Sequence, residues 1–199
     1  MPKSSYDELN WILSLLAQRI AADQIIQEGA ITRLADQKVF ERGIRRCQLH
    51  TRLLQLCLQI HGSPTIEDSR SVDLVRLLNN SRSASVDIVE VNLQRIKPMV
   101  NVLADETSLY ACLRIVIILL LLEDQNLKQI NIYIRRRSGY VSVKFCGGKA
   151  NNLKLLDKEL IGMIESILHY MEGDISWSKS GDKRIVFMRL NLSSQLHFI

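Results

Sequence analysis

Two cysteines and two histidines share one face of a predicted helix, a combination of side chains that can bind zinc. They are Cys47, His50, Cys57 and His61. Because an α-helix rises about 1.5 Å per residue, Cys47 and His61 would lie about 21 Å apart, and one tetrahedral ion cannot collect all four side chains. Any zinc ion would need ligands from another part of the chain. We therefore expect no metal site.

The densest basic stretch is Arg135, Arg136 and Arg137, at the tip of a predicted β-hairpin. Three adjacent guanidinium groups could bind the carboxylates or phosphates of a partner protein, and we take them as the candidate partner-binding residues. A solvated loop would carry the same charges without a partner. The other basic residues are scattered, so we do not expect a nucleic-acid partner despite the net charge of +5. Nucleic-acid binding through the three arginines, together with Arg45 and Arg46, is the weaker alternative.

Chain length and composition describe an ordinary folded protein. With 199 residues, of which 47% are hydrophobic, the chain can bury a substantial core in one domain or two small ones. The first residues, MPKSSYDELN, lack a basic region followed by a long apolar stretch, so no secretory signal is predicted and we expect a cytoplasmic location. The four cysteines have no paired spacing, which predicts reduced and mostly buried thiols.

Eight uninterrupted aliphatic residues occur within LRIVIILLLLED. A helix needs about 20 apolar residues to cross a bilayer, so this run is too short for a membrane anchor. The preceding stretch, ADETSLYACL, is rich in helix-forming residues, and the two together predict a helix from about Asp105 to Glu123 that is buried on most sides. The face that we expect to pack on a sheet consists of Ile115, Ile118, Leu119 and Leu122.

Residues 5–61 predict two long helices. Ser5 and Glu8 have the spacing of a capping box, and the first helix should reach about Gln27, with Gly29 closing it. The second helix runs from about 31 to 61 and carries a polar stripe opposite an apolar face that includes His50. Because two such wide apolar faces cannot cover each other alone, we expect two copies to pair as a four-helix bundle, and hence a homodimer.

From residue 71 the pattern changes to strands that alternate with helices. A short strand and helix come first, then a strand over 85–93, the buried helix, a hairpin over 130–146, a helix over 156–172, and a second hairpin around Gly181. A helical hairpin followed by strands and helices with antiparallel pairs predicts an α+β protein. We place a helical dimerisation domain at 1–64 and a second domain at 65–199.

This order of elements resembles the sensor histidine kinases of two-component signalling, in which a dimerising helical hairpin precedes an ATP-binding domain of the GHKL type. The stretch VNVLADETSLYACLRIVIILLLL looks like the family's strand end and N-box helix, and INIYIRRRSGYVSVKF looks like its central hairpin. SILHYMEGDISWSKSGDKRIVFMRLNL looks like its last helix and two closing strands. The resemblance covers most of the chain from about residue 31, and it implies the α/β sandwich of the kinase ATPase for residues 65–199.

The chain departs from the family at the positions that hold ATP. The resemblance places the Mg²⁺-binding asparagines at Ile115 and Leu119, and a leucine cannot ligate Mg²⁺, which requires oxygen ligands. The aspartate that would bind adenine aligns near Gly147. Residues 149–156 leave almost no room for a nucleotide lid, and GGK is too short for a phosphate-binding loop. We therefore expect no kinase activity and no cofactor.

Histidine phosphotransferases of the same family pair a hairpin with an inactive ATPase-like domain, and their phosphoacceptor is a solvent-facing histidine followed by an acid. The first helix here contains no histidine. His50 is the one candidate well inside a helix, and its place opposite the polar stripe predicts a buried or dimer-interface side chain. We expect a non-catalytic adaptor that binds a response regulator or sensor kinase, with a phosphotransferase that uses His50 as the alternative.

Overall fold

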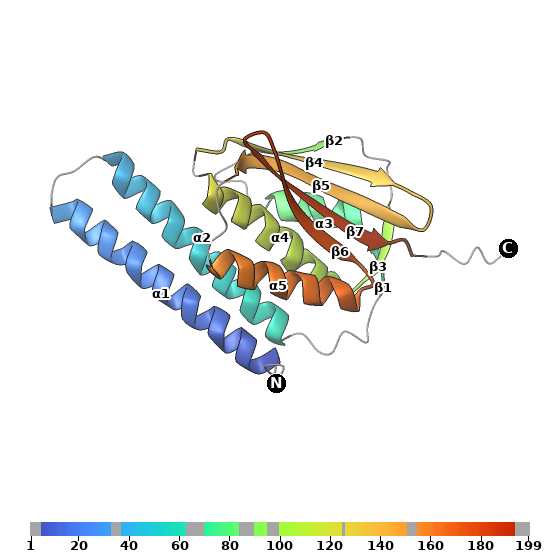
Figure 1. Cartoon of the computed structure of the whole chain (residues 1–199), viewed down its shortest axis with the longest axis horizontal. Helices are drawn as coiled ribbons and strands as arrows, with labels where there is room; N and C mark the ends of the chain where they lie inside the picture. Colours follow the sequence, from blue (N-terminus) through green and yellow to red (C-terminus); the bar gives the residue numbers. More distant parts are fainter. Residues whose placement is uncertain are drawn as a thin grey trace.

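A pair of long helices lies beside a layered unit of helices and strands (Figure 1). The computed structural model describes residues 5–32, 37–62, 70–83, 90–94, 100–124, 126–150 and 155–193. The paired helices are α1 (Ser5–Thr32) and α2 (Gln37–Gly62). The helices of the layered unit are α3 (Leu74–Ser83), α4 (Glu106–Glu123) and α5 (Leu155–Tyr170). Figure 1 shows these helices on one side of a sheet, with α4 and α5 between the sheet and the helical pair.

The main sheet has five strands in the order β2-β4-β5-β7-β6. Its strands are β2 (Glu90–Gln94), β4 (Gln129–Arg136), β5 (Tyr140–Lys149), β6 (Asp174–Ser180) and β7 (Lys183–Asn191). β2 runs parallel to β4, whereas the other neighbours are antiparallel. A second, two-stranded antiparallel sheet joins β1 (Arg70–Asp73) to β3 (Asn101–Ala104). The mixed sheet and its helical layer give the α+β class that the sequence predicts.

Most of the predicted elements are present, and two helix ends are wrong. α4 begins where predicted, because the carboxylate of Asp105 accepts a hydrogen bond from the Ser108 amide at 2.7 Å and caps the helix. α1 does not end at Gly29 but continues to Thr32, and α2 begins later than predicted, at Gln37. Of the strand predicted over 85–93, residues 85–89 lie outside the described residues.

The hydrophobic core is one continuous cluster that includes residues of the helical pair and of the layered unit. α4 stands at its centre, since α2, α3, α5 and β5 all pack against it. All residues of the predicted face are buried except Leu122, which is partly buried. Within the described ranges, no helix is long and apolar enough to cross a membrane.

The helical pair is covered partly from within its own chain. Leu16 of α1 and Leu49 and Leu53 of α2 are at most 1% exposed, and α2 packs on α4 while α1 packs on α5. The two helices are therefore not covered by each other alone, as predicted, but α4 and α5 of the same chain contribute; pairing of two copies into a four-helix bundle stays a prediction. The predicted boundary at 64/65 falls among residues 63–69, outside the described part of the chain, and it also stays a prediction.

Substitution by alanine should change the free energy of unfolding in opposite directions at Gly162 and Gly173. Gly162 lies within α5, where a Cβ atom would meet nothing within 4 Å, whereas a Cβ on Gly173 would lie 2.6 Å from the Arg189 carbonyl oxygen. We expect Gly162→Ala to raise the free energy of unfolding by about 0.5–1 kcal/mol, because alanine restricts the unfolded chain. Gly173→Ala should lower it by about 1–3 kcal/mol through backbone displacement. Urea unfolding measures both, and equal effects would contradict the packing at Gly173.

Candidate functional site

The C-terminal end of α4 is fastened to β7 by a buried ion pair. Arg184 donates to Glu123 through Nη2 at 2.7 Å and through Nε at 3.1 Å, and the two side chains are 9% and 6% exposed. Burial raises the pKa of Glu123, with a smaller contribution in the same direction from Asp157, while Arg184 opposes the shift. Each of the two buried charges thus has an opposite charge beside it.

The end of β5 lies directly against the last turn of α4. The Asp124 carboxylate accepts hydrogen bonds from the Lys149 amide at 3.2 Å and from the Asn126 amide at 3.0 Å. Gly148 has φ of +76°, and a Cβ atom there would lie 3.1 Å from the Leu120 carbonyl oxygen. Only glycine adopts this conformation without strain and tolerates so close a backbone. The backbones of β5 and α4 are therefore in direct contact at this point.

The positions that the resemblance predicted to align with the family's nucleotide-binding residues are buried among hydrocarbon. Ile115 and Leu119 are 0% and 3% exposed. Gly147 is buried as well, and a Cβ atom there would lie 3.3 Å from Cγ1 of Ile130. At these positions the chain offers neither an oxygen ligand for Mg²⁺ nor a carboxylate for an adenine amino group.

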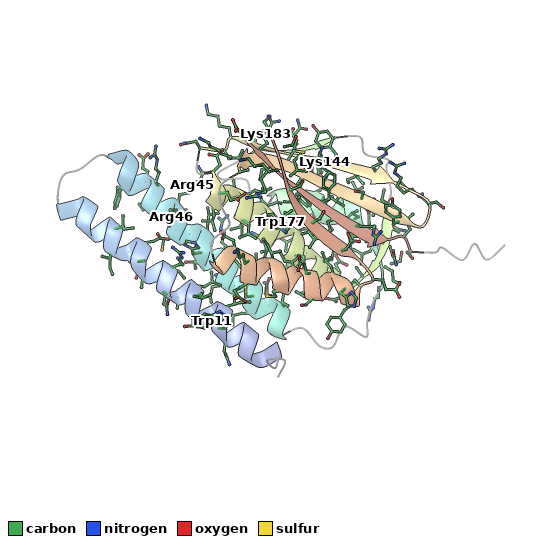
Figure 2. All side chains as sticks on the ribbon, viewed as in Figure 1. Trp11, Arg45, Arg46, Lys144, Trp177 and Lys183 are labelled. Atoms are coloured by element: carbon green, nitrogen blue, oxygen red, sulfur yellow. The ribbon has the colours of Figure 1, made fainter. Side chains whose placement is uncertain are left out.

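α2 covers the same region of α4 from outside. Figure 2 shows Arg45 on the side of α2 that faces α4, and Arg46 on the side that faces α1. Burial lowers the pKa of the Arg45 guanidinium, while the charge of Asp124 at the end of α4 acts in the opposite direction. The electrostatic influence of Asp124 links α2 to the position where β5 meets α4, so three elements converge there.

His50 lies inside the helical pair and contacts an acid on the neighbouring helix. The residue is 4% exposed, and its Nδ1 atom lies 2.8 Å from Oδ2 of Asp23, which is itself 2% exposed. Arg46 also reaches this carboxylate, at 3.3 Å. Burial lowers the pKa of His50, and the hydrogen bond to Asp23 partly offsets the effect. The burial agrees with the helical position of His50, whereas the phosphoacceptor role stays a prediction.

The other candidate residues, which are the three arginines and the buried cysteines, are separated from the C-terminal end of α4 and from His50. Arg135 and Arg136 end β4 and are exposed, and Arg137 begins the turn, where its amide donates to the Tyr140 carbonyl at 2.8 Å. Cys57 and Cys112 are buried, and burial raises the pKa of the Cys57 thiol to about 12. Among the described residues, no group of three or more His, Cys, Asp or Glu side chains could hold a metal ion.

Sequence reasoning missed both ionic groups. Asp23 could have been noticed, because it falls on the helical stripe that contains Leu16 and Ile20, where an acid needs a partner. Glu123 and Arg184 are 61 positions apart in the sequence, and no local pattern connects them. Their pairing depends on how β7 is placed beside the end of α4.

Comparison with solved structures identifies the fold, whereas no protein-family model and no curated protein matches the sequence. The histidine kinase AdeS of Acinetobacter baumannii matches with a TM-score of 0.56 and 16% identity, over 89% of this chain and 97% of that chain. The ATP-binding domain of PrrB from Mycobacterium tuberculosis matches with a TM-score of 0.55 and 15% identity, over 64% of this chain and 100% of that chain.

A third match is full-length ShkA in complex with AMPPNP, with a TM-score of 0.56 and 12% identity, over 92% of this chain and 46% of that chain. At these identities the likeness concerns the fold alone. The predicted resemblance to the histidine kinase fold is therefore confirmed. AdeS and ShkA match more of this chain than the isolated PrrB domain does, so their likeness extends beyond the ATP-binding domain.

The buried histidine should make stability depend on pH. Because burial lowers the pKa of His50 below its usual 6.5, the unfolded chain takes up a proton first as the pH falls. We expect the free energy of unfolding to decrease from about pH 7.5 to about pH 5.5, and His50→Gln to weaken this decrease. His169→Gln, at an exposed position in the last turn of α5, is the matched control and should leave the decrease unchanged. Parallel pH profiles for the wild type and His50→Gln would contradict the prediction.

Proposed function

We propose that this chain is a non-catalytic regulator with a histidine kinase fold, which acts in two-component-type signalling by binding other proteins without using ATP. The observation that carries this proposal is the closed packing at the C-terminal end of α4. Gly148 of β5 lies against the Leu120 carbonyl oxygen there, with 3.1 Å to a Cβ atom built on the glycine. An adenine ring would have to separate β5 from α4 to enter this region.

The chemistry of the surrounding side chains supports the same proposal. Mg²⁺ requires oxygen ligands, and Ile115 and Leu119 present only hydrocarbon at the aligned positions. Glu123, the acid at the end of the same helix, is already bound to Arg184 through two donor atoms. Recruiting Glu123 as a metal ligand would leave the Arg184 guanidinium buried without this carboxylate, a change that typically costs about 3–5 kcal/mol.

The proposed partners are a response regulator, a sensor kinase or another regulatory protein. Arg135, Arg136 and Arg137 form an exposed basic group at the β4–β5 connection, where carboxylates of a partner could reach them. We also propose a homodimer through the helical pair, because Trp11 of α1 and Leu58 of α2 are 42% and 50% exposed. A sedimentation mass of one chain at about 100 µM would contradict the dimer.

The alternative function is a phosphotransferase that uses His50. An aspartyl phosphate must come within bonding distance of the imidazole, yet His50 is 4% exposed and bonded to Asp23. The helical pair would have to open before the reaction. For this reason we favour the regulator that binds without transferring a phosphoryl group.

The first test of this proposal is nucleotide binding. Titration of the protein with ATP and Mg²⁺ should give no binding signal at micromolar concentrations. Leu119→Asn, which returns an asparagine to the aligned position, should lower the free energy of unfolding by about 2–5 kcal/mol and still confer no binding, because it buries an amide among aliphatic side chains. Saturable Mg²⁺-dependent binding to the wild type would contradict the proposal.

The second test compares binding with phosphoryl transfer. We expect one or more purified response regulators from the same organism to bind the chain with an affinity that ATP does not change. Replacement of Arg135, Arg136 and Arg137 by alanine should weaken the complex about tenfold, whereas Arg42→Ala, at an exposed position of α2, should not. Radiolabel that moves from a phosphorylated regulator to the wild type, but not to His50→Ala, would establish the phosphotransferase instead.

A further inference from the structure

The side of the sheet that faces away from α4 and α5 carries aromatic and basic side chains next to one another. Strand register places Tyr133 beside Lys144, and Lys144 beside Phe187, so these three residues form one row across β4, β5 and β7. Arg189 follows Phe187 at the next outward position of β7. Tyr140 of β5 completes a group of five that we call the outer sheet face. Figure 2 shows Lys144 on the strand layer, across the sheet from the helices.

Each ring of the outer sheet face has a cation over it. The Lys144 ammonium lies 5.9 Å from the centroid of Tyr133 and 5.5 Å from that of Phe187. The Arg189 guanidinium lies 5.6 Å from the centroid of Tyr140. Phe187 is 38% exposed, because its position on β7 alternates with the buried Val186 and Met188. The face thus holds apolar rings and positive charges together in contact with solvent.

The charge on this face is positive around Lys144 and Arg189, whereas Glu172 accepts a hydrogen bond from Asn191 at the end of β7. Arg135 lies in the row of Ser142 and Arg189, and it is exposed. The acid described in this row is Asp174 of the edge strand β6, which forms an ion pair with Arg189 at 2.5 Å. An exposed pair of this kind contributes little to stability, so Arg189 can exchange Asp174 for another anion at low cost. The face is complementary to a ligand that carries repeated negative charges.

A ligand with both flat rings and regularly spaced anions matches this surface best. Single-stranded nucleic acid presents bases that stack on aromatic side chains and phosphates that bind lysine and arginine. Open sheets with exposed aromatic residues are an established platform for such binding. Tyr133 and Phe187 lie two strand spacings apart, about 10 Å, so two bases can stack without competing for one ring. An acidic protein surface would use the cations but has no need of the rings.

Basic residues scattered along the sequence led us to expect no nucleic-acid partner, but strand pairing gathers several of them beside aromatic rings. We propose that the outer sheet face, Tyr133, Tyr140, Lys144, Phe187 and Arg189, binds single-stranded nucleic acid. Bases stack on Tyr133 and Phe187, and Lys144 turns from the rings to a phosphate between them. Arg189 and the exposed Arg135 bind flanking phosphates. This site is on the opposite side of the sheet from α4, so it does not depend on the closed packing that supports the proposed regulatory function.

Fluorescence anisotropy with labelled oligo(dT) and oligo(U) of about twelve nucleotides tests this site in the full chain. We expect both strands to bind at micromolar concentration, because each offers bases that stack and phosphates that carry charge. Phe187→Leu and Tyr133→Leu should each weaken binding about tenfold, because they remove a stacking ring and leave the charge unchanged. Thermal unfolding of each variant verifies that the fold is retained.

The salt dependence provides an independent measurement. Lys144→Gln should weaken binding and reduce the slope of log K against log salt by about 0.7, the value for one phosphate contact with a single strand. Lys158→Gln, at an exposed position of α5 on the helical side, is the matched control. It should leave both the affinity and the salt slope unchanged. No binding at about 100 µM protein and about 50 mM salt would overturn the proposal. Equal affinity for polyglutamate, unaffected by Phe187→Leu, would also overturn it and would indicate an acidic protein as the ligand.

Discussion

The structure depends on burying a helix that has aliphatic side chains on every side. Eight consecutive residues cover more than two turns, so the run in α4 leaves no polar face that could be turned to water. The sheet, α3 and α5 cover part of this helix, and α2 covers another part. Each fully buried aliphatic side chain contributes about 1.5–3 kcal/mol relative to an exposed one. Separating α2 from α4 would expose several of them at once, which favours a helical pair held in place beside the layered unit.

A buried hydrogen bond, between His50 and Asp23, and a buried ion pair, between Glu123 and Arg184, favour one arrangement of the apolar surfaces. Hydrophobic contact is non-directional, so helices can slide against each other with little loss of buried area. The contact of His50 with Asp23 fixes α1 against α2 at one level, and the pair of Glu123 with Arg184 fixes α4 against β7. Buried ion pairs add little net stability compared with apolar replacements, because desolvation offsets the attraction. Their contribution here is to make one alignment of the elements better than its neighbours.

The sequence predicts those features whose signal is local. The aliphatic run and the Asp105 cap define α4, and alternating residues define β4, β5 and β7. Gly29 misleads because its cost within a helix is only about 1 kcal/mol, which tertiary packing can exceed. The apolar faces of α1 and α2 are predicted, but a face does not reveal what covers it. The sequence therefore suggested a second copy where α4 and α5 of the same chain contribute.

The sequence predicts a candidate site more completely when the residues of the site lie close together in the chain. The correspondence of Ile115, Leu119 and Gly147 to nucleotide-binding positions stays a prediction from the family pattern, and the structure shows that they are closely packed. The outer sheet face could not be found in this way, because Tyr133, Lys144 and Phe187 belong to three strands that are neighbours only in the folded sheet. Asp23 and His50 are 27 positions apart, and only the packing of α1 on α2 brings them together.

The two sides of β5 connect the closed interior to the outer surface. Val141, Val143 and Phe145 point into the core, so the intervening residues, Lys144 among them, must point outward. A shift of one residue in the register would place Lys144 in the core and Phe145 in solvent, at a cost of several kcal/mol, and the buried Phe145 therefore fixes the position of Lys144. The same packing that brings β5 against α4 on the helical side of the sheet thus holds a cation between the rings of Tyr133 and Phe187 on the other side. Any gain of space near α4 that shifted β5 would disturb both sides of the sheet together.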